Sequence, residues 1–296
     1  MRIGLVDVDG HNFPNLALMK LAAWHKRRGD TVEFANPAAR PYDKVYMSKV
    51  FTFSQDCTDR YDCEVVRAGT GYRDYATTLP EEIEHICPDY SLYGVGEAYG
   101  FLTRGCVNRC PWCIVPHKEG GIRAHADIGE FLDGRRSAVL LDNNVLASEW
   151  GLAQIEKIVR MGIRVDFNQG LDARQVACNP AIAELLAQVK WIRFLRMAYD
   201  CRAMRDDVHR AVELLQRYGV PPRKLFFYVL VREDTADALE RIRELAGMGC
   251  QPFAQPYRDF GHDRKPSREQ WRLAYWCNYK PLFHTVDYEE YRKKGT

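Results

Sequence analysis

The sequence contains no long hydrophobic run, since no segment approaches the roughly 18 consecutive apolar residues that a membrane span needs. It also lacks a secretory apolar region near its start, where Asp7 and Asp9 interrupt the segment MRIGLVDVDG. The 42 Lys and Arg residues nearly balance the 40 Asp and Glu residues, so the net charge of +2 creates no global field for nucleic acid. We therefore expect a cytoplasmic protein without a signal peptide or a membrane partner.

Disulfides are not expected either, although the chain contains ten cysteines. A chain of 296 residues without a secretion signal is expected to keep its thiols reduced. The composition, 46% hydrophobic and 28% charged, is ordinary for a globular protein, and the length allows one or two domains.

Three cysteines stand close together, Cys106, Cys110 and Cys113, in the spacing C-x-x-x-C-x-x-C. Three thiolates on one loop can hold three corners of a metal cluster and leave a fourth position open. No second C-x-x-C and no H-x-x-x-H follows at the distance typical of a structural zinc site. His117 is near enough to complete a Cys3His zinc site, so a non-catalytic zinc or iron–sulfur protein remains an alternative.

The cysteine segment resembles the radical S-adenosylmethionine superfamily, whose signature is C-x-x-x-C-x-aromatic-C, with Trp112 at the aromatic position. The flanking segments TRG before Cys106 and IVP after Cys113 are similar to those of methylthiotransferases and cobalamin-domain radical enzymes. The resemblance implies that the three cysteines hold a [4Fe–4S] cluster whose remaining iron binds S-adenosylmethionine. Reductive cleavage would then give a 5′-deoxyadenosyl radical that abstracts hydrogen from substrate. An external one-electron donor such as flavodoxin or ferredoxin is implied as a partner.

Residues 1–95 are expected to form a small open α/β domain with a linker. The apolar patterns predict strands over 2–8, 31–34 and 42–53 and a helix over 12–28. The Gly- and Pro-rich stretch 55–98 is interpreted as a linker with one helix near 80–86.

This N-terminal domain resembles a cobalamin domain in one short motif. Asp9 and His11 match part of Asp-x-His-x-x-Gly, and Pro14 replaces the glycine. We favour a cobalamin-domain-like module that lacks the cofactor, and a turn or capping role for His11.

Strand and helix patterns alternate through residues 96–260. Strands are expected over 99–103, 138–142, 164–168, 191–197, 224–231 and 251–255, and helices over 128–132, 152–161, 180–189, 203–218 and 235–248. Six β/α units predict an α/β fold with a six-stranded (β/α)6 partial barrel, which is also typical of the superfamily. Residues 261–296 are expected to be a helical extension whose aromatic side chains pack in the core.

Polar residues at the predicted carboxyl ends of the barrel strands are candidates for cofactor binding. With Trp112, which could lie against adenine, they are Asp142, Asn143, Asn144, Asn168, Gln169, Asp172, Arg174 and Tyr199. The resemblance places the amino group of S-adenosylmethionine near residues 142–144, and Arg174 could pair with its carboxylate. Helix capping is the alternative role for Asp142, Asn144 and Asp172.

The sequence thus predicts a radical S-adenosylmethionine enzyme of unassigned reaction. A methylthiotransferase is an alternative, although the spacing of Cys57, Cys63 and Cys87 does not match a second cluster. A cobalamin-dependent methyltransferase is a further alternative. The substrate can be a small molecule, a nucleobase or a peptide, and no catalytic residue is predicted.

Overall fold

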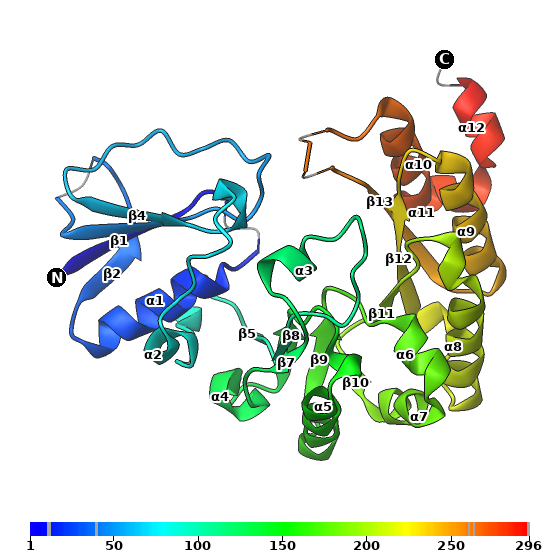
Figure 1. Ribbon diagram of the computed structural model, residues 1–296, viewed down its shortest axis with the longest axis horizontal. Helices are drawn as coiled ribbons and strands as arrows, with labels where there is room; N and C mark the ends of the chain where they lie inside the picture. The colour runs from blue at the N-terminus through cyan, green and yellow to red at the C-terminus, as the bar shows by residue number, and fades with distance from the viewer. Residues whose placement is uncertain (11–12, 39–40, 260, 263, 295–296) are drawn as a thin grey trace. The chain divides into compact units, whose positions relative to one another are not determined.

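The computed structural model describes residues 1–10, 13–38, 41–259, 261–262 and 264–294, and contacts divide the chain into two compact units (Figure 1). Unit 1 comprises Met1–Gly100 and Ala126–Val139, and unit 2 comprises Phe101–His125 and Leu140–Thr296. The expected domain limits at residues 95 and 260 stay a prediction. His11, the candidate cobalamin ligand, lies outside the described residues.

Unit 1 contains a four-stranded parallel sheet in the order β2-β1-β3-β4. Its strands are β1 (Arg2–Asp7), β2 (Thr31–Phe34), β3 (Lys44–Ser48) and β4 (Glu64–Ala68). The buried side chains of Ile3 and Leu5 fill the core face of β1. The small α/β domain predicted from the sequence is therefore confirmed in its first three strands, with a shorter third strand.

Strand β4 corrects the interpretation of residues 55–98 as a linker. Glu64–Ala68 pairs in parallel with β3, and Val65 stands opposite Val45. Only two valines mark this strand, between Glu64 and Arg67, so the local pattern is too short to reveal it. The predicted helix near 80–86 is present as α2 (Glu81–Glu84).

Helix α1 (Leu16–Arg27) packs on this sheet through Leu18, Leu21 and Ala22 (Figure 1). It begins later than predicted because Asn15 caps it: the Asn15 side chain accepts a hydrogen bond from the Leu18 N–H at 3.2 Å.

The second segment of unit 1 carries α4 (Ile128–Leu132), as predicted, and β8 (Ser137–Leu140), which neighbours β5 (Ala98–Gly100). Phe131 is buried, and its carbonyl accepts a hydrogen bond from the Tyr90 hydroxyl at 2.6 Å. A Cβ on Gly100 would lie 2.7 Å from the Phe131 ring, so glycine is required for this close packing.

Unit 2 alternates strands and helices as expected, and its main strands are parallel. The strands are β9 (Arg164–Phe167), β10 (Lys190–Trp191), β11 (Leu195–Ala198), β12 (Leu225–Val231) and β13 (Gln251–Pro256). Helix α5 (Glu149–Met161) precedes β9, and the helices between these strands are α6 (Ala173–Cys178), α7 (Pro180–Gln188), α8 (Arg205–Arg217) and α9 (Thr235–Gly247). Helix α6 is absent from the sequence prediction.

The strand predicted over 191–197 is divided into two short strands, β10 and β11, which belong to different sheets. Strand β10 pairs with β9, whereas β11 joins the three-stranded sheet β11-β12-β13. A single parallel bridge, Leu171 to Met197, links the segment after β9 to β11. The described strands thus form an α/β fold with several parallel sheets and no closed barrel.

The C-terminal extension is helical, as predicted, with α10 (Arg268–Asn278), α11 (Lys280–Thr285) and α12 (Tyr288–Lys294). The aromatic residues Trp276 and Tyr288 are buried, but Trp271, Tyr275 and Tyr279 are exposed. The expectation that the aromatic side chains of this region pack in the core is therefore wrong for one face of α10. No helix of the described residues is long and apolar enough to cross a membrane.

Candidate functional site

The cysteine segment of unit 2 is a loop closed at its base by two short antiparallel strands. Strand β6 (Thr103–Arg104) pairs with β7 (Arg123–Ala124), and α3 (Val115–Lys118) lies between them. Gly105 leaves β6 at φ +79°, and a Cβ there would lie 2.1 Å from the Gly121 carbonyl oxygen. The N–H of the next residue, Cys106, donates to the Gly120 carbonyl at 3.2 Å. Only glycine fits at this crossing of the two ends of the loop.

The three candidate ligands are free, half-buried thiols. The Cys106 sulfur accepts hydrogen bonds from the Asn108 N–H at 3.3 Å and from Asn144 Nδ2 at 3.4 Å. Burial raises the pKa of Cys110 and of Cys113, and the Arg174 guanidinium opposes this shift at Cys110. Hydrogen bonds to sulfur and nearby positive charge both stabilise a thiolate.

Asp172 lies at the centre of the polar network behind the loop. Its carboxylate accepts from Asn108 Nδ2 at 2.8 Å, from Asn144 Nδ2 at 3.1 Å and from Arg174 Nε at 2.8 Å. Burial works to raise the pKa of Asp172, but the bonds from Arg174 and Asn108 hold the pKa below its usual range. Asp172 also caps α6 by accepting from the Arg174 N–H, so the capping role expected as an alternative is present. Its predicted cofactor role stays a prediction.

Asn144 offers one unused acceptor beside the cysteines. The residue is 2% exposed, and its Oδ1 has no hydrogen-bond partner within the part of the chain that the structure describes. A buried amide oxygen without a donor costs free energy, which a ligand N–H would recover.

Asp142 and Asn143 hold the base of the loop. Asp142 accepts from the Thr103 N–H at 2.6 Å, the Thr103 hydroxyl at 2.7 Å and the Leu102 N–H at 3.1 Å, and its burial raises its pKa to about 6. Asn143 Nδ2 donates to Glu119 Oε2 at 2.9 Å, and the same oxygen accepts from the Gly105 N–H at 3.0 Å. Both residues therefore position the loop through its backbone.

Trp112, between the second and third cysteines, is held by two charged groups. The Arg232 guanidinium lies 4.8 Å from the centre of its ring, and the indole N–H donates to the Asp200 carboxylate. Burial raises the pKa of Asp200. The Arg232 Nε is buried and has no hydrogen-bond partner among the described residues.

The remaining predicted residues have contacts of other kinds. The Asn168 N–H donates to the Leu140 carbonyl at 3.0 Å, the Asn168 carbonyl accepts from the Tyr228 hydroxyl at 2.9 Å, and Gln169 is exposed. Tyr199 is fully buried, and its hydroxyl donates to Glu244 of α9 at 2.9 Å. These contacts do not join the three residues to the cysteines, and their predicted cofactor role stays a prediction.

Two residues of the network were outside the sequence prediction, namely Asn108 and Glu119. Asn108 occupies a variable position of the cysteine motif, and Glu119 follows a short helix in a loop of mixed charge. No periodicity or spacing distinguishes either residue, because their roles arise from contacts with distant segments.

The donor chemistry fits an iron–sulfur cluster, although no group of three or more His, Cys, Asp or Glu side chains among the described residues is arranged to hold a metal ion. Three free thiols on one loop, N–H donors to the Cys106 sulfur and a cation near Cys110 are the features that stabilise cluster ligands. No protein-family model and no curated protein matches the chain. The residues of the site therefore carry the functional conclusion.

Proposed function

We propose that the chain is an iron–sulfur enzyme that binds its cluster through three cysteines. More particularly, we assign it to the radical S-adenosylmethionine enzymes, with Cys106, Cys110 and Cys113 holding a [4Fe–4S] cluster. The observation that carries the proposal is the network that joins the Cys106 sulfur, Asn108, Asn144, Asp172 and Arg174. When bound, the cluster and S-adenosylmethionine would supply a one-electron reductive cleavage that leads to hydrogen abstraction.

The chain's own residues have three roles in this proposal. Arg174 keeps positive charge beside Cys110 and favours its thiolate. Asn144 donates to the Cys106 sulfur and presents Oδ1, which has no partner among the residues described, as an acceptor suited to the ammonium group of S-adenosylmethionine. Trp112 provides an aromatic face held in place by Asp200.

The six-stranded partial barrel is part of the proposal. Its support is the parallel direction of β9, β11, β12 and β13 and the bridge from Leu171 to Met197. Asn144 and Asp172 both follow the carboxyl ends of strands in this arrangement, which is where such folds carry their reacting groups.

The test is anaerobic reconstitution with iron and sulfide, followed by addition of dithionite and S-adenosylmethionine. We expect about four irons per chain and the formation of 5′-deoxyadenosine, measured by chromatography. Cys110→Ala is expected to abolish both results. The matched control is Cys178→Ala, which removes an exposed thiol at the end of α6 and should change neither.

Asn144→Ala separates the positioning role from cluster binding. We expect it to keep most of the iron and to raise the concentration of S-adenosylmethionine needed for half-maximal cleavage about tenfold, because one hydrogen bond to a charged group is lost. Cleavage that persists in Cys110→Ala, or zinc in place of iron after anaerobic purification, would refute the proposed function.

A further inference from the structure

Helix α10 and its C-cap residue, Tyr279, expose a row of three aromatic side chains. Trp271, Tyr275 and Tyr279 follow one another at intervals of four residues and are 54%, 59% and 53% exposed. Trp271 and Tyr275 share one side of the helix. Tyr279 continues the row, because its ring stacks on that of Tyr275 with the centres 5.9 Å apart and the planes inclined by 27°.

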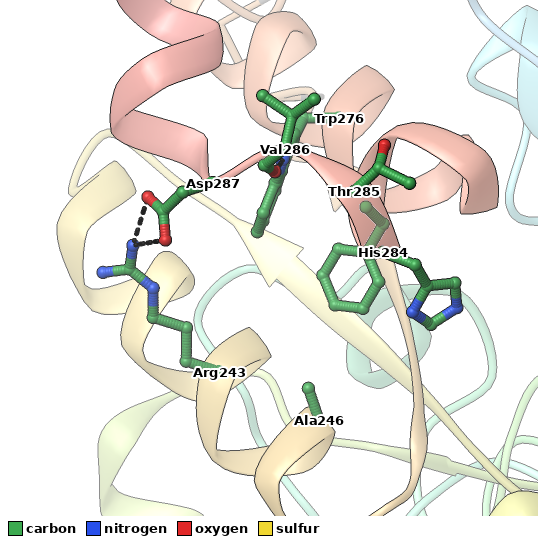
Figure 2. Close-up of a pocket in the computed structure, with 8 residues that line it drawn as sticks. Arg243, Ala246, Trp276, His284, Thr285, Val286 and Asp287 are labelled. Atoms are coloured by element: carbon green, nitrogen blue, oxygen red, sulfur yellow. Dashed lines mark hydrogen bonds and ion pairs between the residues drawn. The ribbon is translucent and has the colours of Figure 1, made fainter.

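The buried side of α10 and its last residue, Asn278, are fixed to unit 2. Asn278 exchanges two hydrogen bonds with the backbone of Ala254, and Gln270 Nε2 donates to the Val231 carbonyl at 2.7 Å. Trp276 and Val286 line a pocket (Figure 2), and Phe283 is a further lining residue. The helix that carries the aromatic face is therefore anchored, so little helix entropy is lost when a ligand stacks on it.

That pocket, of about 450 Å³, is a weaker candidate for a ligand site. Its cation, Arg243, already pairs with Asp287 at 3.2 Å (Figure 2) and also pairs with Glu289.

The charge around the aromatic face is positive. Arg268 is exposed one turn before Trp271, and Arg264 and Lys265 are exposed just ahead of the helix. The only acidic residue of α10, Glu269, forms an ion pair with Arg292 at 3.2 Å. Anions are thus attracted to the start of the row, and the helix offers no unpaired carboxylate to repel them.

We propose that this face of α10 binds single-stranded nucleic acid. Bases stack on the exposed rings of Trp271, Tyr275 and Tyr279, the first two of which lie about 6 Å apart along the helix axis at a rise of about 1.5 Å per residue. Arg264, Lys265 and Arg268 contact the phosphates. The exposed aromatic row contains no aliphatic side chain, which distinguishes it from the apolar stripe of a helix that packs on protein.

The aromatic row begins beside the carboxyl end of β12, and the residue after that end contacts the cysteine loop. Gln270 is bonded to Val231, and the next residue, Arg232, lies over the Trp112 ring. Binding to α10 does not depend on a cluster. The anisotropy experiment therefore tests this proposal separately from the proposed function, which its own iron and cleavage assays test.

The experiment measures fluorescence anisotropy of labelled oligouridine and oligothymidine of about twelve nucleotides, a length within the usual site sizes. We expect both to bind the purified protein, and a duplex of the same length to bind at least tenfold more weakly because its bases are already stacked. Trp271→Ala and Tyr275→Ala are each expected to weaken binding between about fivefold and a hundredfold. Arg268→Gln should reduce the dependence of log affinity on log salt by about one.

The matched control is Tyr218→Ala, which removes a partly exposed tyrosine at the end of α8 and should leave the affinity unchanged. Tyr275→Phe should retain binding because the stacking ring remains. The proposal is overturned by equal affinity for the duplex, or by unchanged binding in the Trp271 and Tyr275 variants. It is also overturned if the full-length protein forms a dimer that Tyr275→Ala dissociates, because the face would then join two copies of the chain.

Discussion

At the scale of single residues, Gly105 decides whether the cysteine loop can close. Its φ of +79° belongs to the left-handed region, and the Gly121 carbonyl occupies the place of a Cβ. Both constraints come from the backbone, so a change of side-chain rotamer cannot relieve them.

Gly105→Ala should lower the free energy of unfolding by about 2–5 kcal/mol, the sum of left-handed strain and overpacking. Gly219→Ala is the control, because Gly219 has φ +89° but nothing within 4 Å of a Cβ, and it should cost about 1 kcal/mol. Urea denaturation of both variants measures the difference. Equal losses would contradict a steric role of Gly121.

Asp142 makes the stability of unit 2 depend on pH. Its pKa of about 6 in the folded chain lies above the ordinary value of 3.8, so its stabilising effect is complete below about pH 4 and is lost as the pH rises through 6. Between pH 4 and pH 7 the free energy of unfolding of the wild type should fall by about 2–3 kcal/mol more than that of Asp142→Asn, whose side chain does not titrate. Urea denaturation at both pH values measures this difference. The prediction is refuted if the wild type becomes more stable relative to the variant as the pH rises.

The sequence predicted the site only in part at this scale. The cysteines and Trp112 form a local motif, and Asn144, Asp172 and Arg174 follow strands, so spacing and strand order singled out residues that the structure joins around the cysteine loop. Their roles toward a cofactor stay predictions. Asn108 and Glu119 act through partners 64 and 24 residues away, and no local pattern encodes such contacts. Tyr199 was selected by its strand position, but its hydroxyl faces Glu244 of α9.

At the scale of helices and strands, Asn278 attaches α10 to the edge of the sheet β11-β12-β13. Its side chain donates to the Ala254 carbonyl at 2.9 Å and accepts from the Ala254 N–H at 2.8 Å, as a neighbouring strand would. The last strand of the sheet thus has its edge satisfied by a helix.

Asn278→Ala should lower the free energy of unfolding by about 2–4 kcal/mol, because two buried backbone groups lose their partners. The change should also reduce ordering of the aromatic face. Gln216→Ala, at an exposed position of α8, is expected to stay within about 0.5 kcal/mol of the wild type. If urea denaturation gives the two variants similar free energies of unfolding, the Asn278 hydrogen bonds do not stabilise the chain as predicted.

Long elements were predictable and short ones were not. Helices α5, α8 and α9 carry apolar residues at helical spacing over several turns, and their positions were predicted within a few residues. Strand β4 and the separation of β10 from β11 are set by pairing with β3, β9 and β12. The outward face of α10 was misassigned because aromatic spacing alone does not show which side of a helix contacts a sheet.

At the scale of the whole molecule, the chain passes three times between the two units. Residues 126–139 supply unit 1 with the buried side chains of Ile128, Phe131 and Leu132. A division of the sequence at one point would separate these residues from their core.

A fragment of residues 1–100 should therefore melt lower than the same fragment joined to residues 126–139 by a flexible linker. We expect a difference of more than about 5 °C, because burial of three apolar side chains contributes several kcal/mol. Circular dichroism during heating measures it, and Phe131→Ala in the joined fragment should remove most of the gain. Equal melting temperatures would show that the segment is dispensable to unit 1.

The pairing of β6 with β7 also has a consequence for loop entropy. Residues 105–122 are joined at both ends before any ligand binds, so the closure entropy of that loop is already lost when unit 2 folds. If the three cysteines hold a cluster, as we propose, the metal is captured within one short ring of chain whose donor atoms are already confined. In that case the loop would act like a chelating macrocycle.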